Sequence, residues 1–313
     1  MPLRIGYACV NTQLPSASRT LRLANVSDER LRELVTANLD ALEAILRWNI
    51  EHDLRVFRLS SETVPFGSHP ANTLHWWEEL AERFAQVGRL MHDGGMSIST
   101  HPGQYTVLGS PKEDFLANSV AEVEYHARLL AAFGLDASHK IVVHAGGVYG
   151  DADAAARRFA GGFGRLPEDA AERLALENDE RWALAEVLPL AHRLGVPVVF
   201  DAFHHMLRPS LPELGTRDAV VVAGETWEAG DGRQEVHFST QAPGRRPGAH
   251  SDTIDLDAFA RFADEVGDLE LDCVLEVKDK ERSALLAQEL LAARVGEPDQ
   301  PRRSRCQTPR ATA

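Results

Sequence analysis

Short apolar segments alternate with longer amphipathic segments along nearly the whole chain, and this alternation constrains the fold more than any other feature of the sequence. Parallel strands that are buried on both faces read as short apolar runs bounded by turn residues. The segments of this kind are 4–10, 55–59, 96–100, 140–144, 173–177, 197–201, 234–239 and 272–277. Eight strand–helix units in about 250 residues or more are typical of a TIM barrel. We therefore predict an α/β protein, a single (β/α)8 barrel over residues 1–295, with an open doubly wound sheet as the alternative.

The segments between these runs have the spacing of amphipathic helices. Apolar residues recur at helical intervals over 31–46, over 77–91 and over 182–194, and Gly195 with Pro197 beyond it predicts the end of the last of these helices. Residues 151–165 predict a surface helix, whereas 207–232 and 240–253 are less regular. Residues 296–313 have no apolar period, and we predict a disordered basic tail there.

The bulk composition limits the setting in which the chain works. Hydrophobic residues make up 44% of the 313 residues, which is enough for a full core, and no apolar run is long enough to cross a bilayer. The N-terminus lacks the layout of a signal peptide, and an odd number of widely spaced cysteines argues against a disulfide framework. We therefore expect a cytoplasmic protein without a membrane partner. The net charge of −14 lowers the expectation of a nucleic-acid partner without excluding it.

Imidazole and carboxylate side chains recur where the predicted strands end, and in a TIM barrel these ends share one mouth. The residues at these positions are His101, His144, Glu177, Asp201, His204, His205, His237 and Glu276. Such a set without thiolates suits Zn²⁺, Mn²⁺ or Fe²⁺, and its carboxylates favour Mn²⁺. Each residue alone has a simpler explanation, such as a hydrogen-bonded histidine, a helix cap or an ion pair. Because the pattern recurs at nearly every strand, we predict a centre of two or three ions.

At these residues the chain resembles the ultraviolet damage endonucleases, and the likeness covers nearly all of residues 1–290. The matching motifs are Gly6-Tyr7-Ala8 with Asn11, Phe57-Arg58-Leu59-Ser60-Ser61 leading to His69-Pro70, His101-Pro102-Gly103-Gln104-Tyr105, His144-Ala145-Gly146-Gly147, Leu176-Glu177-Asn178-Asp179, Asp201 with His204-His205, Val236-His237-Phe238-Ser239, His250, and Glu276-Val277-Lys278. The resemblance implies hydrolysis of the phosphodiester immediately 5′ to a UV photolesion in double-stranded DNA, leaving a 3′-hydroxyl. The lesions would be cyclobutane pyrimidine dimers and 6-4 photoproducts.

The resemblance also implies how the residues divide the work. His101 and His144 would hold one ion that shares Glu177 with a second, and the second would also be bound by Asp201, His237 and Glu276. The third ion would be held by His204 and His250, with His69 nearby as a ligand or phosphate contact. Mn²⁺ is the expected metal, with Zn²⁺ or Mg²⁺ as alternatives, and we expect a monomer without an organic cofactor.

The implied DNA contacts lie in loops. Gln104 and Tyr105 would probe the duplex, while Tyr7 and Asn11 would lie near the flipped lesion. Arg58 would bind phosphate, together with the loop cations Arg245 and Arg246. One departure concerns Glu235, which stands where family members often have a Lys that can be carboxylated. We predict that its carboxylate points into the site, because it shares strand parity with His237.

Three other functions compete with this hypothesis. An abasic-site endonuclease of the endonuclease IV type would share the metal centre without preferring photolesions. A metal-dependent sugar isomerase or epimerase also uses histidines and carboxylates at a barrel mouth, but it would need fewer ions. A non-catalytic damage-binding protein would not need the full ligand set. The remaining histidines lie in predicted helices or turns, and we expect them at the surface; they are His52, His75, His92, His126, His139 and His192.

Overall fold

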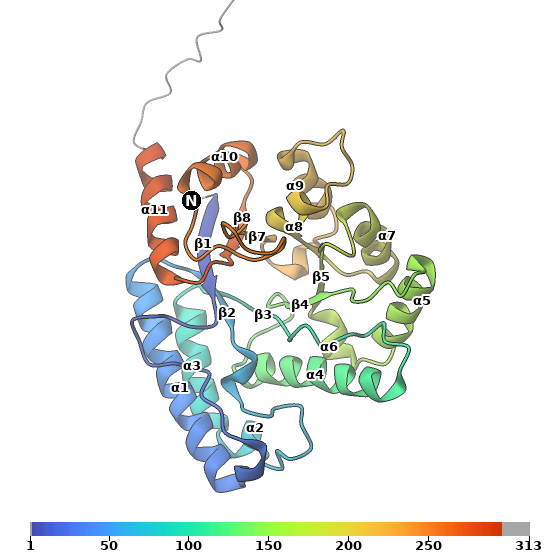
Figure 1. The fold of residues 1–313 in the computed structure, drawn as a ribbon. Coiled ribbons are helices and arrows are strands. Elements are labelled where there is room, and N and C mark those ends of the chain that lie inside the picture. The colour runs from blue at the N-terminus through green and yellow to red at the C-terminus, as the bar shows by residue number, and fades with distance from the viewer. Residues whose placement is uncertain (1, 296–313) are drawn as a thin grey trace, which may run out of the picture.

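Eight parallel strands close into a barrel in the order in which they occur in the chain, in a computed structural model that describes residues 2–295 (Figure 1). The strands are β1 (Leu3–Ala8), β2 (Val56–Leu59), β3 (Ser97–Thr100), β4 (Ile141–His144), β5 (Leu174–Glu177), β6 (Val198–Asp201), β7 (Glu235–Phe238) and β8 (Leu271–Leu275). Strand β8 pairs with β1, which closes the barrel. The (β/α)8 barrel is confirmed, and each strand lies within two residues of its predicted range.

Helices connect successive strands and surround the barrel. They are α1 (Asp28–Glu51), α2 (Trp76–Glu79), α3 (Ala81–Asp93), α4 (Glu113–Ala132), α5 (Ala152–Phe163), α6 (Glu168–Glu172), α7 (Leu184–Leu194), α8 (Ala202–Leu207), α9 (Thr216–Gly224), α10 (Leu256–Val266) and α11 (Glu281–Val295), with the short 3-10 helices η1 (Leu23–Asn25), η2 (Ser61–Thr63) and η3 (Ala229–Asp231). Among the described residues, none of the helices is both long and apolar enough to cross a membrane.

Most predicted helices are confirmed, and the differences have local causes. The pattern over 77–91 forms two helices, because Leu80 leaves helical geometry at φ −112° and ψ 18°. Helix α7 starts at Leu184, after a turn that contains Trp182, and ends at Gly195, whose φ of 66° lies in the left-handed region. The less regular stretch 207–232 contains α9. The predicted basic tail lies outside the described residues.

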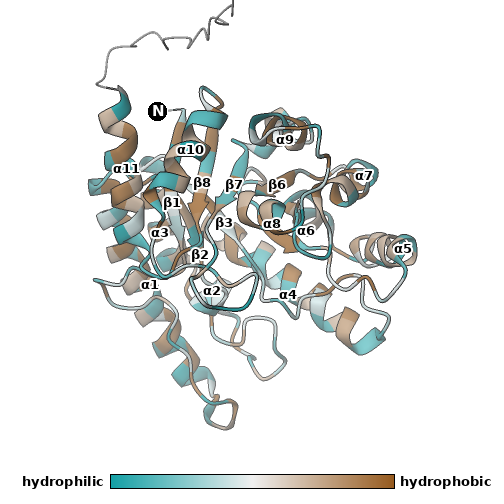
Figure 2. Cartoon of the chain, turned by 45° about the horizontal axis from the view of Figure 1, so that its top comes forward, coloured by the Kyte–Doolittle hydropathy of each residue, from teal (hydrophilic) through white to brown (hydrophobic). Residues whose placement is uncertain are grey.

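The two faces of each strand have different environments. One face packs against the helices in a continuous apolar core, with Phe57 of β2 as an example at 0% exposure. Figure 2 shows hydrophobic and hydrophilic residues alternating along the surrounding helices, as expected for helices that pack one face on the barrel. The other face fills the barrel interior, where small apolar side chains form a layer, among them Val142, Ala175 and Val199. Strand alternation therefore decides which residues reach the interior.

An ion pair occupies the barrel interior near the strand N-termini. The Arg4 guanidinium donates hydrogen bonds to both carboxylate oxygens of Asp272, each at 2.6 Å, and another to the Ser97 hydroxyl. This end of the barrel is therefore filled, and the chemistry-bearing residues lie at the opposite end. One histidine prediction is wrong: His126 of α4 has 0% exposure, because it faces inward beside Glu122 and Tyr125.

Candidate metal centre

The inward-facing residues at the C-terminal ends of the strands converge at the mouth of the barrel. Glu177 and Asp201 are the last residues of β5 and β6, and His237 of β7 pairs in register with Asp201. His101 directly follows β3, and Glu276 directly follows β8. The strand-end residues singled out in the sequence are thus brought together from separate strands.

Three overlapping groups of these side chains have the geometry of metal sites among the described residues. The groups are His101–His144–Glu177, Glu177–His237–Glu276 and Glu177–Asp201–His204, each with potential ligand atoms within 4.8 Å of one another. The first group matches the expected first ion, and Glu177 is the shared carboxylate. Asp201 groups with His204, although its Oδ2 also lies 3.9 Å from His237 Nδ1, where the second ion was expected.

Glu177 is the central residue of the cluster. Its Oε2 lies 2.8 Å from His101 Nε2 and 3.7 Å from His144 Nε2, while its Oε1 lies 2.8 Å from His237 Nδ1. Burial alone would raise the pKa of this carboxyl, but the surrounding imidazoles lower it well below its usual range. Glu177 is therefore an anion at neutral pH with oxygens directed at three histidines.

The cluster holds more buried negative charge than its cations balance. Glu177, Asp201, Glu235 and Glu276 are carboxylates at the barrel mouth, and the one guanidinium among them is that of Arg58. Burial raises the pKa of Asp201 to about 7, and nearby Glu177 and Glu276 add to the rise. Burial opposes protonation of His237, yet Glu177 and Glu235 raise its pKa to about 10. Protons thus take the place of positive charge that divalent cations would supply.

Several buried polar atoms at the mouth have no hydrogen-bond partner. Among them is Asp201 Oδ2, whereas His144 Nδ1 and His204 Nδ1 each face a carboxylate of the loop after β5, at 3.3 and 3.4 Å, without a regular hydrogen bond. A buried acceptor left without a partner is costly, so such atoms mark a site that a ligand completes. Together with the uncompensated carboxylates, they show that the residues present fit divalent metal ions.

The two remaining predicted ligands, His250 and His69, lie outside the three groups. His250 Nδ1 lies 3.0 Å from the Glu276 carbonyl oxygen, and the His250 ring lies 5.9 Å from that of His204. His250 is thus adjacent to the third group, although it is not a member of it. His69 is exposed in the loop before α2 and lies apart from all three groups, in a surface cavity that it shares with Tyr105. A ligand role for His69 is therefore not supported.

Arg58 is an internal cation rather than a surface one. It is 6% exposed, it donates a hydrogen bond to Glu276, and its Nη2 lies 2.6 Å from His237 Nε2. Arg58 lies two residues after Val56 on β2, so both side chains point to the same face of the strand, which is the barrel interior. Arg58 thus lies beneath the cluster in a charge-balancing contact with Glu276, and the phosphate contact expected of it stays a prediction.

Tyr7 and Asn11 are also buried, at 0% and 2% exposure. The Tyr7 hydroxyl donates to Asn49 Oδ1 of α1 at 2.6 Å and accepts from Asn11 Nδ2 at 3.0 Å. Tyr7 alternates with the inward-facing Ala8, so its ring packs against the helical layer. A direct lesion contact by these two side chains is therefore not supported by this structure.

Glu235 lies inside the barrel, as strand parity predicts. Its Oε1 accepts a hydrogen bond from Ser99 Oγ at 3.1 Å and lies 2.9 Å from His237 Nε2. The carboxylate is 4.0 Å from the Arg58 guanidinium. Glu235 thus places an unmodified carboxylate directly beneath the metal groups.

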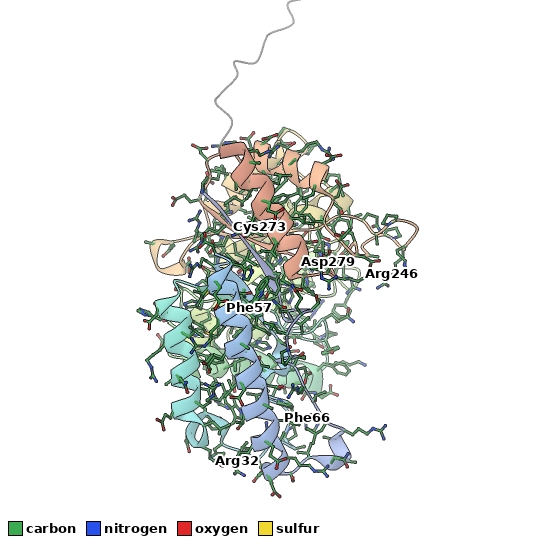
Figure 3. All side chains as sticks on the ribbon, turned by 90° about the vertical axis from the view of Figure 1, so that its left-hand side faces the viewer. Arg32, Phe57, Phe66, Arg246, Cys273 and Asp279 are labelled. Atoms are coloured by element: carbon green, nitrogen blue, oxygen red, sulfur yellow. The ribbon has the colours of Figure 1, made fainter. Side chains whose placement is uncertain are left out.

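A cavity of about 600 Å³ opens above the cluster. His144, His204 and His250 line it together with Gln104, Tyr105, Arg181 and Arg246. The Tyr105 side chain is 79% exposed, although the residue is large and aromatic. Arg246 lies on a loop that projects from the body of the protein (Figure 3). The cavity thus combines a metal-ligand floor with an aromatic and cationic rim.

Sequence reasoning missed two carboxylates beside the histidines. Asp179 Oδ2 lies 3.3 Å from His144 Nδ1, and Glu180 Oε2 lies 3.4 Å from His204 Nδ1. The available signal was their position, since they follow Glu177 by two and three residues in the loop at the barrel mouth. Such residues commonly orient metal-ligating histidines.

The barrel with a cluster of histidines and carboxylates at its mouth defines an enzyme with a candidate multinuclear metal centre. The protein-family model described as UV-endonuclease UvdE matches residues 3–296. The chain is 36% identical to a UV DNA damage endonuclease of Clostridium perfringens over 90% of this chain and 69% of that protein. It is 33% identical to a putative UV-damage endonuclease of Acanthamoeba polyphaga mimivirus over 90% and 89% of the two chains. The chain therefore belongs to the UV-endonuclease family and is a DNA-repair endonuclease.

Solved structures give the same result. The crystal structure of SacUVDE superposes with a TM-score of 0.89 at 36% identity, covering 94% of this chain and 99% of that chain. Endonuclease IV from Thermus thermophilus has a TM-score of 0.54 at 14% identity, and an L-ribulose 3-epimerase has 0.53 at 17%. These last two likenesses show a common barrel and nothing about the reaction.

Proposed function

We propose that this chain hydrolyses the phosphodiester immediately 5′ to UV photolesions in double-stranded DNA, leaving a 3′-hydroxyl, with two or three divalent ions. The substrates are cyclobutane pyrimidine dimers and 6-4 photoproducts. The observation that carries the proposal is the set of three ligand groups that share Glu177 beneath a cavity open to solvent. A cluster that shares one carboxylate suits a phosphodiester, whose attacking and leaving oxygens both need charge stabilisation.

The residues that would hold the ions are His101, His144, Glu177, Asp201, His204, His237, His250 and Glu276. Their mix of imidazoles and carboxylates favours Mn²⁺, with Zn²⁺ or Mg²⁺ as alternatives. When bound, such ions supply an activated water and neutralise negative charge on the phosphate. No organic cofactor is needed for this hydrolysis.

The chain's own residues prepare the centre. Glu177, Asp201 and Glu276 provide the anionic oxygens, and Arg58 holds Glu276 in place through a hydrogen bond. Glu235 lies 2.9 Å from His237 Nε2 and can accept a hydrogen bond from that ring, which orients it. His69, exposed beside Tyr105, is placed to contact a phosphate at the edge of the duplex.

Lesion recognition would use the loop after β3. Removing a nucleotide from the stack costs less when its bases are damaged than when they are paired. The exposed Tyr105 ring can fill the vacated stack, and the Gln104 amide can hydrogen-bond the bases left unpaired. Arg181, Arg245 and Arg246 would bind phosphates around the same cavity, and the acting species would be a monomer.

The test is nicking of supercoiled plasmid, irradiated against unirradiated, with Mn²⁺ or with EDTA. We expect nicking of the irradiated plasmid only, with Mn²⁺ only, and no nicking by a Glu177→Gln variant. End-labelled duplexes with one defined photolesion then locate the cleaved bond. Equal cleavage of an abasic duplex would indicate an enzyme of the endonuclease IV type. Lesion binding without cleavage under any divalent metal would overturn the proposal.

A further inference from the structure

Asp179, in the loop after β5, is held in one orientation by the loop itself. Its Oδ1 accepts hydrogen bonds from the backbone amides of Arg181 and Trp182, both at 2.7 Å, and its own amide donates to the Trp182 carbonyl at 2.8 Å. The Trp182 indole donates to the Gly146 carbonyl at 2.8 Å, which ties this loop to the loop after β4. Asp179 is 7% exposed. The direction of its second oxygen is therefore fixed by the backbone.

That second oxygen faces one edge of the His144 ring. Asp179 Oδ2 lies 3.3 Å from His144 Nδ1, whereas His144 Nε2, on the other edge, lies 3.7 Å from Glu177 Oε2. The Nδ1 atom is buried and makes no regular hydrogen bond, and Asp179 Oδ2 is the acceptor that faces it. A neutral imidazole carries one proton, and an acceptor at Nδ1 keeps the proton there. The lone pair of Nε2 is then free toward the cluster.

Two other histidines at the mouth have the same arrangement with a different partner. His101 Nδ1 lies 3.0 Å from the Pro102 carbonyl, and its Nε2 faces Glu177. His250 Nδ1 lies 3.0 Å from the Glu276 carbonyl. In both rings a backbone oxygen holds Nδ1, so no substitution can remove it cleanly. For His144 the partner is a side chain.

We propose that Asp179 is a positioning residue that fixes the tautomer and orientation of His144 for metal binding at the His101–His144–Glu177 group. The inference rests on the metal centre of the proposed function. Asp179 itself belongs to none of the three metal groups, since its carboxylate lies on the edge of the ring away from Glu177.

Two substitutions separate positioning from a purely structural turn. Asp179→Asn keeps an oxygen for the two amides but turns an NH₂ donor toward His144 Nδ1, which moves the ring proton to Nε2. Asp179→Ala removes both functions. We expect both variants to bind one equivalent of Mn²⁺ about 10- to 100-fold more weakly, measured by calorimetry on the metal-free protein, while the other equivalents keep their affinity. If Asp179 only builds the turn, Asp179→Asn will bind Mn²⁺ like the wild type, and that result overturns the proposal.

A matched control is Asp255→Asn. Asp255 Oδ1 accepts the same kind of hydrogen bond, from the Ala258 amide, at the exposed start of α10. We expect this variant to bind every equivalent of Mn²⁺ like the wild type.

A second measurement needs neither metal nor a variant. The tautomer of His144 can be read from imidazole nitrogen shifts, recorded at a pH at which the shifts themselves show a neutral ring. We expect the proton on Nδ1 in the metal-free wild type and on Nε2 in Asp179→Asn. A wild-type proton on Nε2 overturns the proposal. If the wild type binds no divalent ion, the proposed metal centre fails, and the tautomer still decides the role of Asp179.

Discussion

Arg58 offers the sharpest test of the charge balance, because its two interpretations predict opposite results for Arg58→Met. As an internal cation it is 6% exposed and bonded to Glu276 beside Glu235 and His237. Removing one partner of a buried ion pair leaves an uncompensated charge and costs about 3–5 kcal/mol. If Arg58 were instead a phosphate contact, Arg58→Met would leave the stability of the protein intact. It would reduce the steepness of the plot of log Kobs for DNA binding against log[salt] by about 0.9. We expect the first result.

Both quantities can be measured on the same proteins. Urea unfolding of the metal-free form gives the loss of stability, and Mn²⁺ should restore part of it because the ions supply positive charge at the same place. Binding to an irradiated duplex with a cleavage-resistant linkage, over a range of salt concentrations, gives the slope. Arg246→Met is the matched control, because Arg246 is exposed on the cavity rim. This variant should unfold at the same urea concentration as the wild type, and its DNA binding should depend less steeply on salt. A loss below about 1 kcal/mol for Arg58→Met, with a reduced slope, would refute the internal role.

Three further predictions follow from the same structure. The pKa of His237 is near 10 and that of Asp201 near 7, so both groups carry protons that they must lose to bind a metal ion. Mn²⁺ binding should therefore release protons, and the affinity for Mn²⁺ should rise between pH 6 and pH 8. Binding heats that are the same in buffers of different ionisation enthalpy would contradict this. Tyr105→Ala should slow cleavage of irradiated duplex roughly 5- to 150-fold, the loss of one stacked base, while Mn²⁺ content stays the same and Leu23→Ala, another exposed apolar side chain, has no effect. In α5, Gly161→Ala meets no atom within 4 Å and should stabilise the protein by about 0.5–1 kcal/mol, whereas the Cβ of Gly162→Ala would overlap the Leu108 carbonyl oxygen and should destabilise it by about 1–3 kcal/mol; equal unfolding midpoints would contradict the packing argument.

The barrel and the inward-facing ligands could be predicted because they depend on periodicity. Apolar runs bounded by turns fix the strands, and the last residue of each run then reaches the mouth. Glu177, Asp201 and His237 were found in this way. Glu235 could be placed inside the barrel because it shares parity with His237.

Arg58 and Tyr7 were assigned by resemblance instead, and the same parity argument would have placed Arg58 inside the barrel and Tyr7 against the helices. Arg58 shares parity with the inward-facing Val56, and Tyr7 alternates with the inward-facing Ala8. Asp179 depends on a turn whose hydrogen bonds join residues of two different loops, so no local pattern predicts where its oxygens point. His126 shows a related limit, because a histidine beside Glu122 on a helix reads as solvent-exposed until the packing of that helix is known.

The acidity of the chain takes a specific form at the barrel mouth. Phosphate binding requires positive charge, yet the floor of the cavity is built from carboxylates, and the nearest guanidinium is hydrogen-bonded to Glu276. In the metal-free protein, protons on His237 and Asp201 offset part of this charge, and they must leave when ions bind. The exposed Arg246 on the rim can attract a duplex, but it lies outside the cluster that must approach the scissile phosphate. Under the proposed function, metal loading and productive DNA binding should therefore be coupled, since the floor would repel phosphate until bound ions reverse its charge.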